Sequence, residues 1–243
     1  MIPEDHPRYR SLVARERIAD GVRSGMVVVE GASAHGRGEA FDYLLGEESS
    51  TSAKRAEKTA AAFLLAGFRP VISVNGNTAA LAADEIRDLA EASGAAVEIN
   101  LFHRTEERMA AITAHLKAHG VPVLEGTAER LLSLSHDRAL CLRNGIYAAD
   151  VVLVPLEDGD RCEALVAMGK TVITIDLNPL SRTAQTATLT IVDELTRALP
   201  NITRACREET PEAGEQLIAD HDNHRLLYAA LQTMQETLTD AMD

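Results

Sequence analysis

The sequence has few cysteines, no long apolar segment and a small share of basic residues. Its three cysteines, Cys141, Cys162 and Cys206, are odd in number and widely spaced, which argues against a disulfide framework or a cysteine zinc site. No apolar stretch approaches the ~20 residues that a membrane span needs. No basic and then apolar segment opens the chain either. We therefore expect a cytoplasmic protein that does not enter a membrane.

The charge balance restricts the partners of the protein. Acidic residues outnumber basic ones by 37 to 24, which gives a net charge of −13 at pH 7. Nucleic acids and anionic membrane surfaces would be repelled, so neither is expected as the main partner. An anionic substrate must instead meet a local cluster of arginines. With 243 residues, 46% of them hydrophobic, the chain can bury a substantial core.

Apolar strand patterns and helix patterns alternate along most of the chain. We expect strands at residues 71–74, 97–101, 150–155, 171–176 and 188–192, with a further short candidate at 121–124. We expect helices at residues 7–23, 52–66, 78–92, 106–119 and 162–168. Because the strands are apolar throughout and alternate with helices, the sequence predicts an α/β fold with a mainly parallel sheet covered on both faces.

The tail from residue 211 is expected to form one long helix. Leu227, Leu231, Met234 and Leu238 recur at alternating spacings of four and three. This heptad-like stripe fits packing on the same domain about as well as it fits a dimer seam.

Polar residues follow several of the predicted strands. Parallel sheets bind ligands beyond the carboxyl ends of their strands, which lie at one edge. Residues 75–77, Asn100, residues 157–160 and residues 176–178 all occupy such positions and can bind anions or metal ions. We expect the functional site along this edge.

Arg37 lies between two glycines, Gly36 and Gly38, in a segment expected to be a turn. The glycines would let backbone amides approach a phosphate while the guanidinium neutralises it. A tight turn with a surface arginine is an equal alternative. The segment is not a Walker loop, because no Gly-Lys-Ser/Thr follows, and it lacks the third glycine and preceding strand of a dinucleotide fingerprint.

Residues 176–183 leave a predicted strand and carry a carboxylate, an amide, hydroxyls and a guanidinium. Asp176 or Asn178 could bind a ribose or a base edge. Ser181 and Thr183 could donate to phosphate oxygens, and Arg182 could stabilise charge on a reacting phosphate. The alternative is a structural Asn-Pro turn.

An acidic segment, residues 157–161, follows another strand. Its carboxylates surround Gly159, and Asp158 and Asp160 are candidates for holding Mg²⁺ through water and phosphate oxygens. A solvated acidic turn is equally consistent with the pattern. Arg161 could cap the acidic group or hold a substrate carboxylate instead.

Two further strand ends carry candidate anion ligands. Asn77 could cap the helix that follows it, and the exposed amides beside it could hold an anion. Arg104, after the strand at 97–101, could clamp a phosphate. Asn75, Asn77 and Arg104 would share one edge of the sheet.

Five segments taken together are more specific than any one of them: residues 6–9, 36–44, 70–77, 151–161 and 176–182. They closely resemble the archaeal phosphopantothenate synthetase family, also called 4-phosphopantoate–β-alanine ligase, over roughly residues 1–205. The resemblance implies a Rossmann-like homodimer. We therefore expect a single α/β ligase domain over residues 1–243, with an N-terminal helical segment (1–66), a Rossmann-like core (67–205) and a helical tail (211–243).

The resemblance also implies an activity in coenzyme A synthesis. The family joins 4-phosphopantoate to β-alanine with ATP and releases AMP and diphosphate. By resemblance, the ATP-binding positions are Arg15, Arg37, Asp176, Leu177, Asn178, Arg182, Thr183, Glu194 and Leu195.

In this chemistry the substrate carboxylate attacks the α-phosphate of ATP, and the β-alanine amine then displaces AMP from the acyl-adenylate. Arg37, Arg182 and Mg²⁺ would offset the phosphate charges, so both arginines are candidate catalytic residues. We place the phosphate of phosphopantoate between Asn75, Asn77 and Arg104. The competing reading is a nucleotide-binding regulatory dimer without ligase activity; a kinase, which would form ADP, is a third.

Overall fold

A five-stranded parallel sheet forms the centre of the computed structural model, which describes residues 2–241. Its strands are β1 (Pro70–Val74), β2 (Ala96–Ile99), β5 (Val151–Leu153), β6 (Thr171–Ile175) and β7 (Leu189–Ile191). They are arranged in the order β2-β1-β5-β6-β7, and every neighbouring pair is parallel. The prediction of a mainly parallel sheet is confirmed. From β1 the chain adds β2 on one side of β1, and it then adds β5, β6 and β7 in succession on the other side. The topological switch point therefore lies between β1 and β5.

The larger core lies on one face of the sheet. Here α4 (Gly76–Ser93) and α8 (Leu195–Glu208) pack beside each other, with α3 (Thr51–Ala66) next to α8. Alternate strand residues point to opposite faces, and Ile72 and Val74 of β1 are buried on this side. Ser50 caps α3 by accepting a hydrogen bond from the amide of Ala53.

The other face of the sheet has a smaller core. Val71 and Val152 point to it and pack with Cys162 and Leu165 of α6 (Gly159–Ala167). A short helix, α7 (Arg182–Thr186), lies beside α6. Helices therefore cover both faces, as the alternating pattern predicts.

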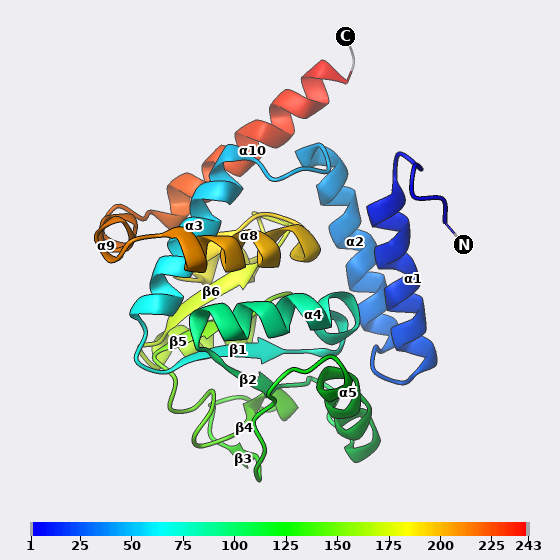
Figure 1. The fold of residues 1–243 in the computed structure, drawn as a ribbon, viewed down its shortest axis with the longest axis vertical. Coiled ribbons are helices and arrows are strands. Elements are labelled where there is room, and N and C mark those ends of the chain that lie inside the picture. The colour runs from blue at the N-terminus through cyan, green and yellow to red at the C-terminus, as the bar shows by residue number, and fades with distance from the viewer. Residues whose placement is uncertain (1, 242–243) are drawn as a thin grey trace.

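The first two helices, α1 (Tyr9–Arg23) and α2 (Val29–Leu45), lie side by side beyond the carboxyl end of the sheet, toward which the arrow of β1 points (Figure 1). Three contacts fix the course of α2: Gly31 with Asn77, Gly38 with Leu177, and Asp42 with Arg197. These partners follow β1, β6 and β7 in turn. Helix α2 therefore crosses the carboxyl edge of the sheet.

The expectation of a turn at Gly36 and Gly38 is wrong. Both glycines lie inside α2, where the backbone amides are used by the helix and cannot bind a phosphate. Helix α2 ends at Leu45, and Gly46 follows it in the left-handed conformation (φ 83°) that favours glycine. Arg37, between the two glycines, can therefore contact a ligand only through its side chain.

The segment between β2 and β5 differs from the prediction. Helix α5 (Glu106–Ala118) forms as expected, but the strand predicted at 121–124 is reduced to one isolated parallel bridge between Val97 and Val123. A two-stranded antiparallel ribbon, β3 (Glu129–Arg130) and β4 (Leu140–Cys141), follows it, with a 3₁₀ turn between the two strands.

The tail forms two helices, so the prediction of one long helix is wrong. They are α9 (Pro211–Ala219) and α10 (Asn223–Asp240), and a new N-cap at Asp222 begins the second. Leu227 and Met234 are buried against the chain's own core, whereas Leu238 is 54% exposed. Most of the apolar stripe therefore packs within the chain. None of the helices among residues 2–241 is long and apolar enough to cross a membrane.

Candidate active site

The loop after β6 is held in one conformation by its own side chains. Asp176 accepts a hydrogen bond from the amide of Asn178 (2.9 Å) and another from the Ser181 hydroxyl. Ser181 in turn caps α7 by accepting from the amide of Ala184 (2.9 Å). Burial raises the pKa of Asp176, although both hydrogen bonds oppose the shift. The polar residues predicted here thus form a preorganised turn at the carboxyl edge.

Arg182 and Thr183 begin α7, next to this turn. The Arg182 side chain is exposed and forms a two-pronged ion pair with Glu163, with both N–O distances 2.6 Å. Exposed pairs of this kind contribute little to stability, so the guanidinium can exchange this partner for a phosphate at low cost. Thr183 is buried, and its hydroxyl donates to the carbonyl of Glu157 (2.8 Å). Thr183 therefore joins the loops that follow β5 and β6.

Arg37 is an exposed residue of α2, the helix that approaches this edge from the opposite side. The neighbouring Gly38 lies against Leu177, and a Cβ at Gly38 would be 3.6 Å from the Leu177 side chain. The structure thus brings α2, which carries Arg37, to the loop after β6. Arg15, on α1, lies farther out and pairs with Glu39 of α2 (Nε to the two carboxylate oxygens, 2.9 and 3.0 Å).

Glu194 is the N-cap of α8, just after β7. Its carboxylate accepts from the amide and the hydroxyl of Thr196 (2.7 and 2.5 Å), and burial raises its pKa. Leu195 is 2% exposed. The side chains at these two positions serve the helix start and the core, so contact with a ligand would come mainly from the backbone.

Asn75 and Asn77 occupy the edge beside β1, but their side-chain amides are already used. Asn75 caps α4 by accepting from Thr78 and donates to the carbonyls of Pro155 and Leu156 (3.0 and 3.1 Å). Asn77 donates to the carbonyl of Gly31 (2.8 Å). These asparagines bridge β1 to the loop after β5 and to α2.

Sequence reasoning missed a second arginine beside Arg104. Arg108 lies four residues farther along, in the first turn of α5, and donates to the carbonyls of Met26 (2.8 Å) and His103 (2.7 Å). The Met26 carbonyl is 82 residues away in the chain, so no local pattern points to this contact. Arg104 precedes the helix N-cap, Thr105, so the spacing of four does not place the two arginines on one helix face.

A buried charge network lies beneath the acidic segment. The Arg161 side chain is fully buried, pairs with Glu157 and donates to the hydroxyl of Ser73 (3.1 Å). Arg138 also pairs with Glu157 (3.4 Å). Of the two alternatives for Arg161, the structure shows the one in which it neutralises the acidic group rather than facing a substrate.

The predicted magnesium ligands also have side-chain partners. Asp158 accepts from Arg138 Nε (3.0 Å), and Asp160 lies 2.7 Å from His136 Nε2. Within residues 2–241, no group of three or more His, Cys, Asp or Glu side chains is arranged to hold a metal ion. The residues therefore do not form a protein cage for Mg²⁺.

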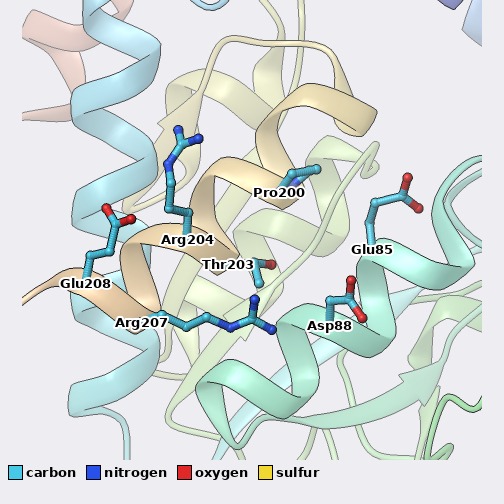
Figure 2. Close-up of a pocket in the computed structure, with 7 residues that line it drawn as sticks. All are labelled: Glu85, Asp88, Pro200, Thr203, Arg204, Arg207 and Glu208. Atoms are coloured by element: carbon cyan, nitrogen blue, oxygen red, sulfur yellow. The ribbon is translucent and has the colours of Figure 1, made fainter.

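Two cavities lie away from the centre of this edge. One, of about 310 Å³, is a charged hollow between α4 and α8, with Arg207 extending toward Asp88 (Figure 2). The other, of about 630 Å³, lies between α1, the segment at 47–54 and the first turn of α8. It reaches Thr196 and so borders the predicted nucleotide positions, whereas the first contains none of them.

The fold and this edge define an α/β protein that presents arginines and turn residues along the carboxyl edge of a parallel sheet. A sequence model described as phosphopantothenate/pantothenate synthetase matches residues 52–237. The chain belongs to this family. A protein of Methanospirillum hungatei named 4-phosphopantoate–β-alanine ligase is 56% identical over the full length of both chains.

Other relatives carry the same name. The protein of Methanosarcina mazei is 57% identical, over 98% of this chain and 95% of its own. That of Thermococcus onnurineus is 50% identical, over 98% of this chain and 94% of its own. The similarity therefore extends over the helical tail as well as the core.

Proposed function

We propose that this protein is an ATP-dependent ligase that condenses 4-phosphopantoate with β-alanine to form 4'-phosphopantothenate, AMP and diphosphate in coenzyme A biosynthesis. The observation that carries the proposal is the 56% identity, over both full lengths, to a relative that is named for these two substrates. The arrangement of the carboxyl edge supports it, because Gly38, the neighbour of Arg37 on α2, lies against Leu177 in the loop that precedes Arg182.

The proposed reaction has two steps. A carboxylate oxygen of 4-phosphopantoate attacks the α-phosphorus of ATP, the bond to the β-phosphate oxygen breaks, and diphosphate leaves. The β-alanine amine then attacks the carbonyl carbon of the acyl-adenylate, the bond to the AMP oxygen breaks, and the amine releases its extra proton. Charge builds up on phosphate oxygens in the first step, which arginine side chains stabilise.

The nucleotide is proposed to lie along the β6 and β7 side of the edge. Asp176 and Asn178 hold the turn that would contact the nucleoside, and Arg37 and Arg182 would face the phosphates. Glu194 and Leu195 would offer backbone groups at the start of α8. No protein nucleophile is required, since the substrate's own carboxylate attacks.

We also propose that the protein uses Mg²⁺, forms a homodimer and works in the cytoplasm. Mg²⁺ would arrive with the triphosphate, whose oxygens are its usual ligands, and Asp158 has a carboxylate oxygen without a donor among the described residues. A homodimer would use the exposed Tyr228 and Leu238 of α10. The three buried free cysteines suit a reducing cytoplasm.

The test is to incubate the protein with ATP, Mg²⁺, 4-phosphopantoate and β-alanine and to separate the nucleotides. The ligase predicts AMP and diphosphate in amounts equal to the amide formed, and no AMP when either acid is omitted. Tight ATP binding without turnover would support the regulatory dimer instead, and formation of ADP would support a kinase. Arg37→Met and Arg182→Met should lower AMP formation without unfolding the protein.

A further inference from the structure

Arg104 and Arg108 follow β2, at the carboxyl edge of the sheet. Neither forms an ion pair with a described acidic side chain, although 12 other arginines and lysines of the described chain do so. Both are partly buried, so water screens their charges incompletely. A desolvated cation without a counter-charge is costly unless an anionic ligand supplies one.

The guanidinium of Arg108 is fixed at the first turn of α4. Two of its nitrogens donate to the carbonyls of Met26 and His103, and its third nitrogen, Nη2, would be 2.7 Å from a Cβ placed at Gly76. Gly76 is the first residue of α4 and comes directly after the β1 edge. The missing side chain at Gly76 therefore leaves room for this guanidinium, which keeps one nitrogen free for a ligand.

The surroundings add positive charge rather than cancel it. Burial and the nearby charge of Arg138 both lower the pKa of Arg108, and no carboxylate opposes them. Arg138 itself is already paired with Glu157 and Asp158. Arg104 acts electrostatically on the buried Glu98. The Glu98 carboxylate, however, accepts its hydrogen bonds from the backbone amides of Leu142 and Ile146 and not from Arg104.

A second, independent feature lies beside this position. Asn100 is fully buried, and its backbone N–H donates to the carbonyl of Val74, the residue before the α4 cap. The side-chain oxygen of Asn100 is buried without a hydrogen-bond partner among the described residues. Such an orphaned acceptor is costly unless a ligand or water donates to it. A hydroxyl group of a bound substrate would supply that donor.

We propose that Arg108, together with Arg104, binds the phosphate group of 4-phosphopantoate at the switch point. This rests on the proposed function, and it assigns the phosphate to a residue outside the pocket of Asn75, Asn77 and Arg104. Two guanidinium groups match a phosphate dianion better than the single charge of the β-alanine carboxylate. The first amides of α4 face the same end of the helix and favour negative charge there. The phosphate then lies on the β1 and β2 side, and the nucleotide on the β6 and β7 side.

The test is Arg108→Met, with pantoate used as a substrate that lacks only the phosphate. The variant should raise the KM for 4-phosphopantoate by about tenfold or more, which corresponds to at least ~1.4 kcal/mol, and should leave the KM values for ATP and β-alanine within about twofold. Turnover of pantoate should not change. The preference for 4-phosphopantoate over pantoate therefore falls, and Arg108→Lys should restore part of it. Arg104→Met should shift the same constant.

Arg87→Met is the matched control. Arg87 also donates to a backbone carbonyl, that of His119 (3.1 Å), and joins α4 to the end of α5 away from the edge. This variant should keep the substrate preference. A rise in the KM for β-alanine or ATP instead, or an equal loss with both acids, would overturn the proposal, because the first places a different anion at Arg108 and the second shows a purely structural role.

A binding measurement separates this proposal from the ligase activity. In the absence of ATP, 4-phosphopantoate should raise the Tm of the wild-type protein more than pantoate does, and Arg108→Met should abolish that difference. If the wild type forms no AMP but shows the difference, the ligase proposal fails and the phosphate site stands. If AMP forms and the two acids stabilise both proteins equally, the phosphate site fails alone.

Discussion

Gly159, at the start of α6, lies directly against the side chain of Arg182. A Cβ placed at Gly159 would be 2.9 Å from both Cβ and Cγ of Arg182 and 3.0 Å from its Cδ. Non-bonded carbon atoms do not approach each other this closely. The absence of a side chain at Gly159 therefore permits the position that Arg182 takes at the sheet edge. The relationship links the acidic segment after β5 to the turn after β6.

Gly159→Ala should therefore impair the reaction through Arg182. The added methyl group pushes the arginine side chain away from the edge, and the proposed contact with the ATP phosphates weakens. We expect kcat/KM for ATP to fall by about tenfold, which corresponds to ~1.4 kcal/mol. Steady-state AMP formation at varied ATP measures this, with unfolding in urea as the check on stability. An unchanged kcat/KM would show that Arg182 does not act on the nucleotide.

Gly36→Ala, in contrast, should raise the stability of the protein and leave ATP binding unchanged. A Cβ at Gly36 meets nothing within 4 Å, and the residue lies in the interior of α2. Alanine favours the helix over glycine by about 0.5–1 kcal/mol, so the variant should unfold at higher urea concentration while its KM for ATP is unchanged. A large rise in the KM for ATP would contradict this and support the phosphate-binding turn expected from the sequence.

The error at Gly36 shows what local sequence can and cannot predict here. Glycine weakens a helix, so two glycines flanking Arg37 favour a turn when only their neighbours are considered. The contacts that keep α2 helical come from distant segments, such as Arg197 pairing with Asp42 across 155 positions. The strands of the sheet, by contrast, are continuous apolar runs whose burial is local information, and all five were predicted.

The same limit explains the rest of the differences. Pro200 lies inside α8, and a proline usually ends a helix, so this helix was not expected from the sequence. Arg108 could not be assigned because its partner Met26 belongs to another part of the chain. The edge as a whole was predictable, since parallel strands bring their carboxyl ends together whatever the loops contain.

A buried carboxyl near this edge should make stability depend on pH. Burial, together with the charge of the neighbouring Asp193, raises the pKa of Glu57 to about 8. Between the ordinary glutamate pKa of about 4.3 and that value, the unfolded chain has lost the proton and the folded chain keeps it. The free energy of unfolding must therefore fall as the pH rises through this range.

Glu57→Gln should remove that dependence, because the amide resembles the protonated acid and cannot ionise. Relative to the wild type, the variant should gain stability between pH 5 and pH 8, by on the order of a few kcal/mol. Urea unfolding at both pH values measures the gain. The exposed Glu16→Gln on α1 is the control for losing one negative charge. Parallel pH dependence in Glu57→Gln and the wild type would contradict a raised pKa at this position.

The buried pair of Arg161 and Glu157 should matter to folding more than any exposed pair does. Both side chains are at most 1% exposed, so Arg161→Met leaves the Glu157 carboxylate without its nearest counter-charge, in a place that water does not reach. Breaking such a pair costs about 3–5 kcal/mol.

Arg143→Met, which breaks an exposed pair with Glu129 (side chains 62% and 47% exposed), should change stability little. Adding Glu157→Gln to Arg161→Met should recover part of the loss, since no uncompensated charge then remains, and Arg138 keeps Asp158. Urea unfolding of the four proteins gives the comparison, and similar small losses for both arginine variants would show that the Arg161 network does not stabilise the fold.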